Sequence, residues 1–196
     1  MPITGPYCPR CGVAFEGNGP NHLCGECLAD PPPFKQAAAA FQYGGAAKDA
    51  ILRLKYGRVT WIGEHLGRRL AKTAARLKKV DAVVPIPLHF KRLRTRGFNQ
   101  SALIAKPIAR ALGLPLQADV LRRVRDTDPQ AGLAKAARAE NIHGAFVAQR
   151  PLRIRGRRIL LVDDVITTGE TVKEAARVLS AAGAASVKAI AAARAC

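Results

Sequence analysis

The chain has 196 residues, 48% of them hydrophobic, and its 32 Lys and Arg against 14 Asp and Glu leave a formal net charge of +18. The length suits one domain with a hydrophobic core and a small appendage, and the lack of any apolar run of about 18 residues argues against a membrane span. The charge favours a polyanionic partner such as nucleic acid, a phosphorylated metabolite or an anionic membrane face, the alternative being a solvated basic surface.

Four of the five cysteines lie near the start of the chain, in the motifs Cys8-Pro9-Arg10-Cys11 and Cys24-Gly25-Glu26-Cys27. Two Cys-x-x-Cys motifs supply the four thiolates that Zn²⁺ prefers in a closed, tetrahedral structural site. A segment of about 30 residues cannot build a core, so metal binding would supply much of its folding free energy. His22 could replace one ligand, but four cysteines already fill the shell. The pattern predicts a structural zinc site at Cys8, Cys11, Cys24 and Cys27.

The composition changes after the stiff connector Pro31-Pro32-Pro33. We therefore expect a zinc-binding module at residues 1–33 and a second domain at residues 34–196. The first residues lack a charged stretch followed by an apolar one, so we expect no signal peptide and a cytoplasmic protein. Cys196 is expected to be a free terminal thiol.

Residues beyond the connector alternate between strand and helix patterns. In chain order we expect a strand at 37–43, helices at 46–56 and 61–77, a strand at 81–84, a basic loop at 85–97, a helix at 98–112 that Pro107 kinks or divides, a weak strand at 114–123, a long loop at 122–141, strands at 144–148 and 158–162, a helix at 170–182 and a last strand at 186–192. Strand and helix patterns alternate, and the clearest strand, at 158–162, is continuously apolar. Both features predict an α/β fold in which a mostly parallel sheet has helices on both faces.

Two acids, Asp163 and Asp164, follow the buried strand Ile159-Leu160-Leu161-Val162, and Thr167-Thr168-Gly169-Glu170-Thr171 leads from them into a helix. Ligands of open α/β sheets bind outside the carboxyl ends of the strands. The hydroxyls, the glycine turn and the free N–H groups of the helix N-terminus together suit a phosphate, while the two carboxylates can accept hydrogen bonds from vicinal hydroxyls. The motif therefore suits a sugar 5-phosphate. The alternative is an ordinary capped strand-loop-helix; the Walker A and Gly-x-Gly-x-x-Gly motifs are absent.

The basic loop carries four cations within six residues, Lys91, Arg92, Arg94 and Arg96. In a parallel sheet this loop would share the ligand edge with Asp163, where its charges could neutralise a pyrophosphate group. A solvated basic loop is the alternative.

The acidic pair with its Thr-Gly-x-Thr loop resembles the signature of type I phosphoribosyltransferases. That resemblance implies that Asp163 and Asp164 hold ribose hydroxyls, and that Thr167, Thr168, Gly169 and Thr171 hold the 5-phosphate. Mg²⁺ would bind together with phosphoribosyl pyrophosphate. Glu170 departs from the pattern, and we expect it to point outward.

Other motifs are similar to the competence-associated ComF family, which includes GntX-like proteins. They cover nearly the whole chain and are, in order, Leu54-Lys55-Tyr56, Val84-Pro85-Ile86-Pro87-Leu88, Arg96-Gly97-Phe98-Asn99-Gln100, Asp126-Thr127-Asp128-Pro129-Gln130, Arg138 to Asn141 and Gly144-Ala145-Phe146. The resemblance also includes an N-terminal zinc knuckle, and it implies a mobile loop over the leaving pyrophosphate at residues 122–141.

Three functions are consistent with these patterns. The first is a phosphoribosyltransferase that displaces pyrophosphate at the ribose anomeric carbon with an unidentified acceptor. The second is a single-stranded DNA-binding competence protein, working with other DNA-uptake proteins, in which Phe90 and Phe98 flank the cations. The third is a sensor that binds the metabolite without turnover. Glutamine amidotransferase chemistry is disfavoured, because the chain begins Met-Pro-Ile and lacks an N-terminal nucleophile.

Overall fold

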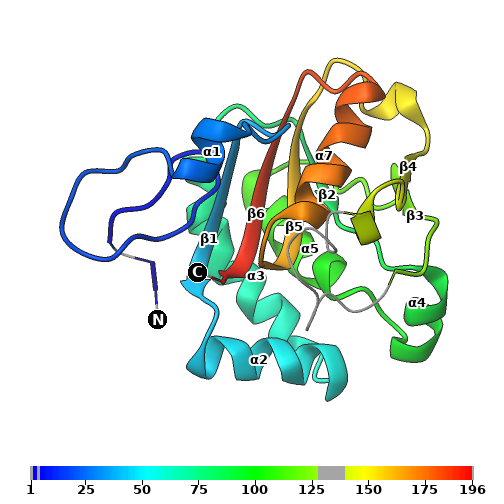
Figure 1. Cartoon of the computed structure of the whole chain (residues 1–196). Helices are drawn as coiled ribbons and strands as arrows, with labels where there is room; N and C mark the ends of the chain where they lie inside the picture. Colours follow the sequence, from blue (N-terminus) through cyan, green and yellow to red (C-terminus); the bar gives the residue numbers. More distant parts are fainter. Residues whose placement is uncertain (1, 4, 128–139, 196) are drawn as a thin grey trace.

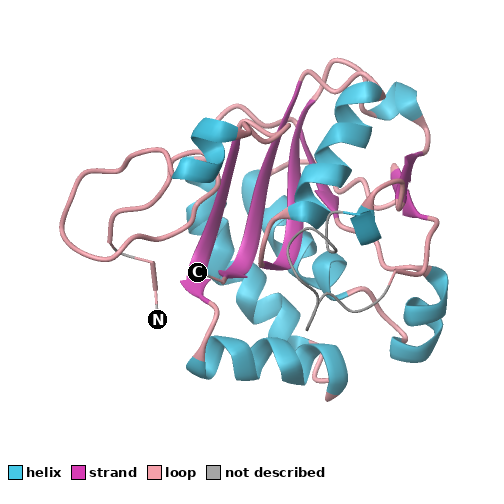
Figure 2. Ribbon diagram, viewed as in Figure 1, coloured by secondary structure: helices cyan, strands magenta, loops and turns pink. Residues whose placement is uncertain are grey.

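The apolar runs of the chain form a four-stranded, fully parallel sheet (Figures 1 and 2). The computed structural model describes residues 2–3, 5–127 and 140–195. The strands lie in the order β1-β6-β5-β2, with bounds β1 Gln36–Gln42, β2 Ala82–Pro85, β5 Arg158–Ile166 and β6 Ser186–Arg194. This arrangement confirms the predicted α/β class.

The register of β5 determines where its two acids lie. On one side β5 pairs with β6 as far as Ile166, whereas on the other side its pairing with β2 stops at Val162, opposite Pro85. Asp163 and Asp164 therefore lie inside the strand, beyond the end of β2. The strand predicted at 158–162 therefore ends too early, because two carboxylates are atypical of a buried strand.

One face of the sheet is covered by three helices, α2 (Gly45–Tyr56), α3 (Trp61–Arg76) and α5 (Gln100–Leu112). Helices α3 and α5 pack closely because Gly67 has no side chain: a Cβ there would lie 2.2 Å from Pro107 Cγ and 2.4 Å from the Ile104 carbonyl oxygen. The expected division of the helix at Pro107 is wrong, since α5 continues through this residue, whose ring is buried against Gly67.

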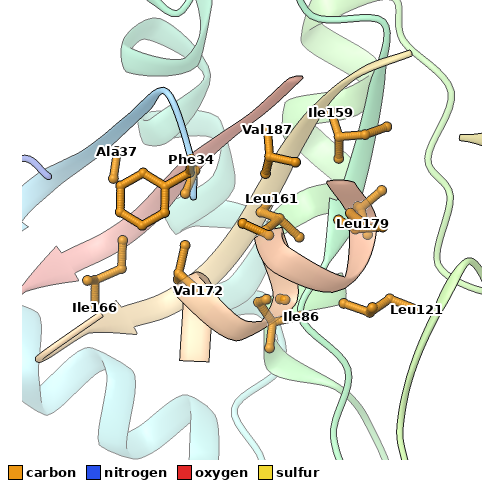
Figure 3. Packing of buried hydrophobic residues seen from close by; sticks show 14 of the residues in the cluster. Phe34, Ala37, Ile86, Leu121, Ile159, Leu161, Ile166, Val172, Leu179 and Val187 are labelled. Atoms are coloured by element: carbon orange, nitrogen blue, oxygen red, sulfur yellow. The ribbon is translucent and has the colours of Figure 1, made fainter. Parts of the chain in front are cut away.

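The other face is covered by α7 (Glu170–Ala181), by an antiparallel pair, β3 (Leu121–Arg123) and β4 (Phe146–Ala148), and by the N-terminal segment. Figure 3 shows side chains from these elements and from the sheet meeting in one core, among them Phe34, Leu161, Val172 and Leu179. The helix α1 (Gly25–Ala29) carries Cys27, which belongs to the same core together with Cys8 and Cys11.

The N-terminal segment also pairs with the outer edge of β1. Pro2 forms an antiparallel bridge with Phe41, the Ile3 N–H donates to the Ala40 carbonyl at 3.2 Å, and the Ala37 N–H donates to the Arg10 carbonyl at 2.7 Å. The segment is thus hydrogen-bonded directly to the sheet.

Two expected loops differ in the structure. The basic loop contains a helix, α4 (Phe90–Arg96). None of its side chains is buried, so the sequence has no apolar stripe that would predict a helix there. Residues 121–123 are the strand β3, 140–142 are helical, and a 3-10 turn, η1 (Pro151–Arg153), precedes β5. Cys196, Asp128-Pro129-Gln130, Arg138 and most of the expected loop lie outside the described residues.

Across those described ranges, no helix is both long and apolar enough to traverse a bilayer.

Candidate functional site

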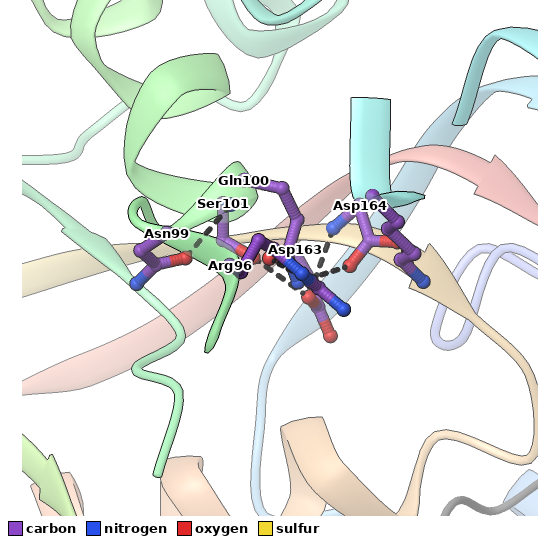
Figure 4. A network of polar contacts seen from close by, with 7 residues as sticks. Arg96, Asn99, Gln100, Ser101, Asp163 and Asp164 are labelled. Atoms are coloured by element: carbon purple, nitrogen blue, oxygen red, sulfur yellow. Dashed lines mark hydrogen bonds and ion pairs between the residues drawn. The ribbon is translucent and has the colours of Figure 1, made fainter. Parts of the chain in front are cut away.

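Asp163 is buried beside the N-terminus of α5 (Figure 4). The Ser101 hydroxyl donates to its Oδ1 at 3.0 Å, and the Asp164 backbone N–H donates to the same oxygen at 2.9 Å. Burial, followed by repulsion from the Asp164 carboxylate, raises the pKa of Asp163 to about 8, although the nearby Lys55 charge opposes the rise. Asp163 therefore holds a proton at neutral pH.

Asp164 is also buried, and a cation pairs with it. The Lys55 ammonium, at the end of α2, forms an ion pair with its Oδ2, and Gln100 Nε2 donates to its Oδ1 at 3.1 Å. Burial lowers the pKa of Lys55, but attraction to Asp164 and Asp163 outweighs it and the pKa is raised. A lysine from one face of the sheet is thus held charged against the acid pair.

Asn99 explains why Gln100 and Ser101 face the acids. Its Oδ1 accepts from the N–H groups of Ser101 (2.9 Å) and Ala102 (3.4 Å), an N-cap that starts α5. Its Nδ2 donates to the Ile86 carbonyl at 3.0 Å, which fixes the helix start just after β2. Arg96 extends this network, because its Nη1 donates to Gln100 Oε1 at 2.5 Å. A continuous chain of hydrogen bonds therefore joins α4 to Asp164.

The Thr-Gly loop follows β5 as expected. Gly169 has φ +85°, a left-handed conformation that favours glycine, and it is the N-cap of α7. The Thr168 hydroxyl is buried and has no hydrogen-bond partner among the described residues. Glu170 does not point outward: its side chain is only 12% exposed and pairs with Lys173 at 2.9 Å, so a neighbouring cation in the same helical turn neutralises it.

A cavity of about 640 Å³ lies beside α4. It is lined by Lys55, Tyr56, Arg58, Lys91, Arg92, Thr95, Arg96, Asp126 and Thr127. Three of the four cations expected at the site line this cavity, while Arg94 is exposed and does not. Lys55 connects the cavity to Asp164, whereas the Thr-Gly loop lines a separate cavity.

Among the described residues that line the cavity, Asp126 is the carboxylate, and cations surround it. Its Oδ1 lies 3.4 Å from His89 Nδ1 and 3.8 Å from Arg92 Nε, and its Oδ2 lies 3.6 Å from Lys91 Nζ. Arg92 also donates to the Thr127 carbonyl. These contacts hold the chain leaving β3 against α4.

The four expected cysteines come together. Their sulfur atoms all lie within 4.8 Å of one another, and Cys11 and Cys24 Sγ are 3.7 Å apart, close to the value of about 3.8 Å that tetrahedral Zn–S bonds of ~2.3 Å require. Burial opposes ionisation of the Cys8 thiol, but hydrogen bonds from the backbone N–H groups of Cys11, Cys24 and Arg10 lower its pKa to about 6. Burial raises the pKa of Cys11 and of Cys27. His22 stacks on Phe15 instead. The donor set suits a tetrahedral metal ion.

Comparison with known proteins decides the family. Residues 99–195 match the phosphoribosyl transferase domain family. DNA utilization protein YhgH from Escherichia coli (strain K12) is 36% identical to the chain, over 92% of the chain and 81% of that protein. Competence protein F from Haemophilus influenzae is 34% identical, over 91% of the chain and 80% of that protein. The chain belongs to the ComF family.

Other relatives of this ComF protein are more distant. Competence protein ComFC from Bacillus subtilis is 28% identical, over 90% of the chain and 72% of that protein. Among solved structures, the glutamine phosphoribosylpyrophosphate amidotransferase from B. subtilis is similar to this chain, with 25% sequence identity and a TM-score of 0.46. The matched part is 65% of this chain and 25% of that enzyme. The ComF protein thus combines a type I phosphoribosyltransferase-like domain with an N-terminal cluster of four cysteines.

The sequence motifs did not predict site roles for Lys55, Gln100, Ser101 and Asp126. Lys55, Gln100 and Asp126 fall in motifs that support the family resemblance, which was a usable signal. Nothing in those motifs shows which partner each side chain meets, because the contacts join residues far apart in the chain, such as Gln100 and Asp164, 64 positions apart, and Lys55 and Asp164, which are further apart still.

Proposed function

We propose that this ComF protein binds phosphoribosyl pyrophosphate with Mg²⁺ and transfers the phosphoribosyl group to an acceptor. The observation that carries the proposal is the buried pair Asp163 and Asp164 near the end of β5, the strand that leads into the glycine turn before α7. The pair suits ribose hydroxyls, and the helix N-terminus with the Thr168 hydroxyl suits the 5-phosphate. A buried hydroxyl with no partner among the described residues is the kind of donor that a phosphate oxygen would satisfy.

Lys91, Arg92 and Arg96 are proposed to receive the pyrophosphate. They line the 640 Å³ cavity that Lys55 connects to Asp164. In the reaction, a bond forms from the acceptor to the anomeric carbon as the bond to pyrophosphate oxygen breaks, and pyrophosphate leaves with the electron pair. Fixed cations stabilise that departing charge without reorganising. Mg²⁺, bound near Asp163 and Asp164, would supply further positive charge to the departing pyrophosphate.

The cysteine cluster is proposed to bind structural Zn²⁺, in a module at residues 1–33 attached to a domain at residues 34–196. Four thiolates at tetrahedral spacing leave no open coordination position, which favours a structural role over a catalytic one. The cytoplasm, where phosphoribosyl pyrophosphate is used, is the proposed location.

Calorimetry tests the proposed substrate. Zinc-replete wild-type protein should bind phosphoribosyl pyrophosphate in the presence of Mg²⁺, and Asp164→Asn should bind about tenfold more weakly or worse, because a charge-assisted hydrogen bond is worth roughly 1.5–3 kcal/mol. Asp119→Asn is the matched control, since Asp119 pairs with Arg150 and Arg153 away from the acids. Folded wild-type protein that shows no binding at millimolar ligand would refute the proposal.

Single-stranded DNA is a second candidate ligand, and exposed aromatic side chains favour it. Tyr56, Trp61 and Phe90 are 73%, 68% and 58% exposed, and the Arg96 guanidinium lies 5.4 Å from the Tyr56 ring centroid. Aromatic platforms beside cations suit stacked bases. Affinity for a short oligonucleotide should fall steeply with salt, and it should fall further in Trp61→Ala than in Leu152→Ala, a variant at an exposed apolar residue on η1. Equal affinities for the two variants, or affinity independent of salt, would exclude this surface.

A further inference from the structure

The Asp126 carboxylate lies where the side chains of His89, Lys91 and Arg92 converge. Its distances to their nitrogen atoms are 3.4 Å, 3.6 Å and 3.8 Å, in that order. All three exceed the roughly 2.7–3.2 Å of a direct hydrogen bond. The carboxylate is therefore attracted to the three side chains as a group and is closely bonded to none of them.

His89 shows that this group can receive an anion that fits more closely. Its side chain is only 6% exposed, and its Nδ1, which faces Asp126, is buried without a hydrogen-bond partner among the described residues. The residue is held in place, because it forms a β-bridge with Arg123 directly before α4 begins. A buried polar atom without a partner is unfavourable, and an oxygen nearer than those of Asp126 would satisfy it.

Asp126 can leave this position without unfolding the chain around it. Its side chain is 35% exposed, so rotation about its own bonds can move the carboxylate toward solvent. The next residue, Thr127, is buried and anchored: Arg92 donates to its carbonyl and Arg123 donates to its hydroxyl. The backbone thus holds Asp126 beside the cations, while the carboxylate itself is held loosely.

We propose that Asp126 occupies the anion site of the ligand-free protein and that the pyrophosphate group displaces it on binding. The inference rests on the proposed function, in which Lys91 and Arg92 receive pyrophosphate. Pyrophosphate carries more negative charge than one carboxylate, and its oxygens are not tethered to the chain. They can therefore approach His89 Nδ1 and both cations at the short distances of charge-assisted hydrogen bonds. Asp126 is a built-in competitor, which returns to the cations when pyrophosphate leaves.

The competition should have a measurable size. When only a fraction of the molecules has a free site, the apparent affinity for a ligand falls by that fraction. Part-exposed ion pairs are individually weak, so three loose contacts should keep Asp126 in the site in about nine molecules of ten. Removing the carboxylate should therefore raise the affinity for pyrophosphate about tenfold.

Calorimetry with inorganic pyrophosphate and Mg²⁺ tests the competition in the full chain. Asp126→Asn should bind pyrophosphate about tenfold more tightly than wild type. Asp126→Glu, which restores the charge, should bind within about threefold of wild type. Asp119→Asn is the matched control, because it removes the same charge from a part-exposed carboxylate that pairs with Arg150 and Arg153. It should bind within about twofold of wild type.

Three results would overturn the proposal, and they are distinguishable. Unchanged or weaker binding by Asp126→Asn would mean that the carboxylate orders the cations or contacts the ligand. An equal gain in Asp119→Asn would mean that net charge alone sets the affinity. No binding by wild type or by Asp126→Asn would remove the anion site itself, and the proposed function would then lose its pyrophosphate site as well.

Melting temperatures provide a second readout that separates competition from a merely structural role. Asp126→Asn leaves Lys91 and Arg92 without their counter-charge, so the ligand-free variant should melt below wild type. Saturating pyrophosphate should then raise its melting temperature by more than it raises that of wild type, because tighter binding stabilises more. A variant with a lower melting temperature and a smaller rise on adding pyrophosphate would overturn the proposal.

Discussion

Binding of phosphoribosyl pyrophosphate with Mg²⁺ should release a proton from Asp163. The pKa of this carboxyl is about 8 in the protein alone, so at pH 7 it is about nine-tenths protonated. Ribose hydroxyls and a divalent cation favour the ionised form. If binding returns the pKa to about 4, the complex forms with release of about 0.9 proton at pH 7, about 0.5 at pH 8 and about 0.1 at pH 9.

Calorimetry in buffers of different ionisation enthalpy measures this release directly. The slope of the observed enthalpy against the buffer ionisation enthalpy gives the number of protons exchanged. Asp163→Asn removes the titrating group, so any release that remains in this variant comes from the ligand itself. Asp119→Asn should behave as wild type.

Lys55 provides an independent check of the cause. Its charge lowers the pKa of Asp163, while Asp164 raises it. Lys55→Met should therefore increase the proton release at pH 9, and Asp164→Asn should decrease the release at pH 7. A wild-type protein that binds the ligand with the same proton release as Asp163→Asn at every pH would refute the assignment of the proton to Asp163.

Three further substitutions have definite expected outcomes. Cys24→Ser should lose most of the zinc found in wild-type protein purified without added metal, and full zinc content by elemental analysis would contradict the ligand assignment. Gly67→Ala should destabilise the fold by about 1–3 kcal/mol in denaturant unfolding, because its Cβ overlaps Pro107 Cγ and the Ile104 carbonyl; an unchanged midpoint would mean that α3 and α5 separate at little cost. Thr168→Val should weaken phosphoribosyl pyrophosphate binding while leaving the melting temperature close to that of wild type, and unchanged affinity would remove this hydroxyl from the phosphate site.

Periodicity and composition predicted the fold class and most of the elements. The parallel sheet, the helices on both faces and the clustering of four cysteines all follow from local patterns, since each depends on residues close together in the chain. Helix α4 was missed because two exposed turns bury no side chain and so leave no apolar repeat. The continuation of β5 through Asp163 and Asp164 was missed because it depends on pairing with β6, which is not visible in β5 itself.

The site was predictable only in part, for a related reason. The acids, the Thr-Gly loop and three of the cavity cations were named from motifs, because each motif is a contiguous segment. The pairing of Lys55 with Asp164 and the contacts of Asp126 with α4 depend on how separate elements stack. Such contacts have no local signature in the sequence, because their residues come together only in the folded chain.

The pairing of the N-terminal segment with β1 has a consequence for how the protein can be handled. An outermost strand that exposes its N–H and C=O groups is a template for another chain, and it promotes aggregation. Here Pro2, Ile3 and Arg10 occupy part of that edge. A fragment beginning at residue 34 would uncover the backbone of β1 along its full length, so its solubility, more than its fold, would be the property at risk.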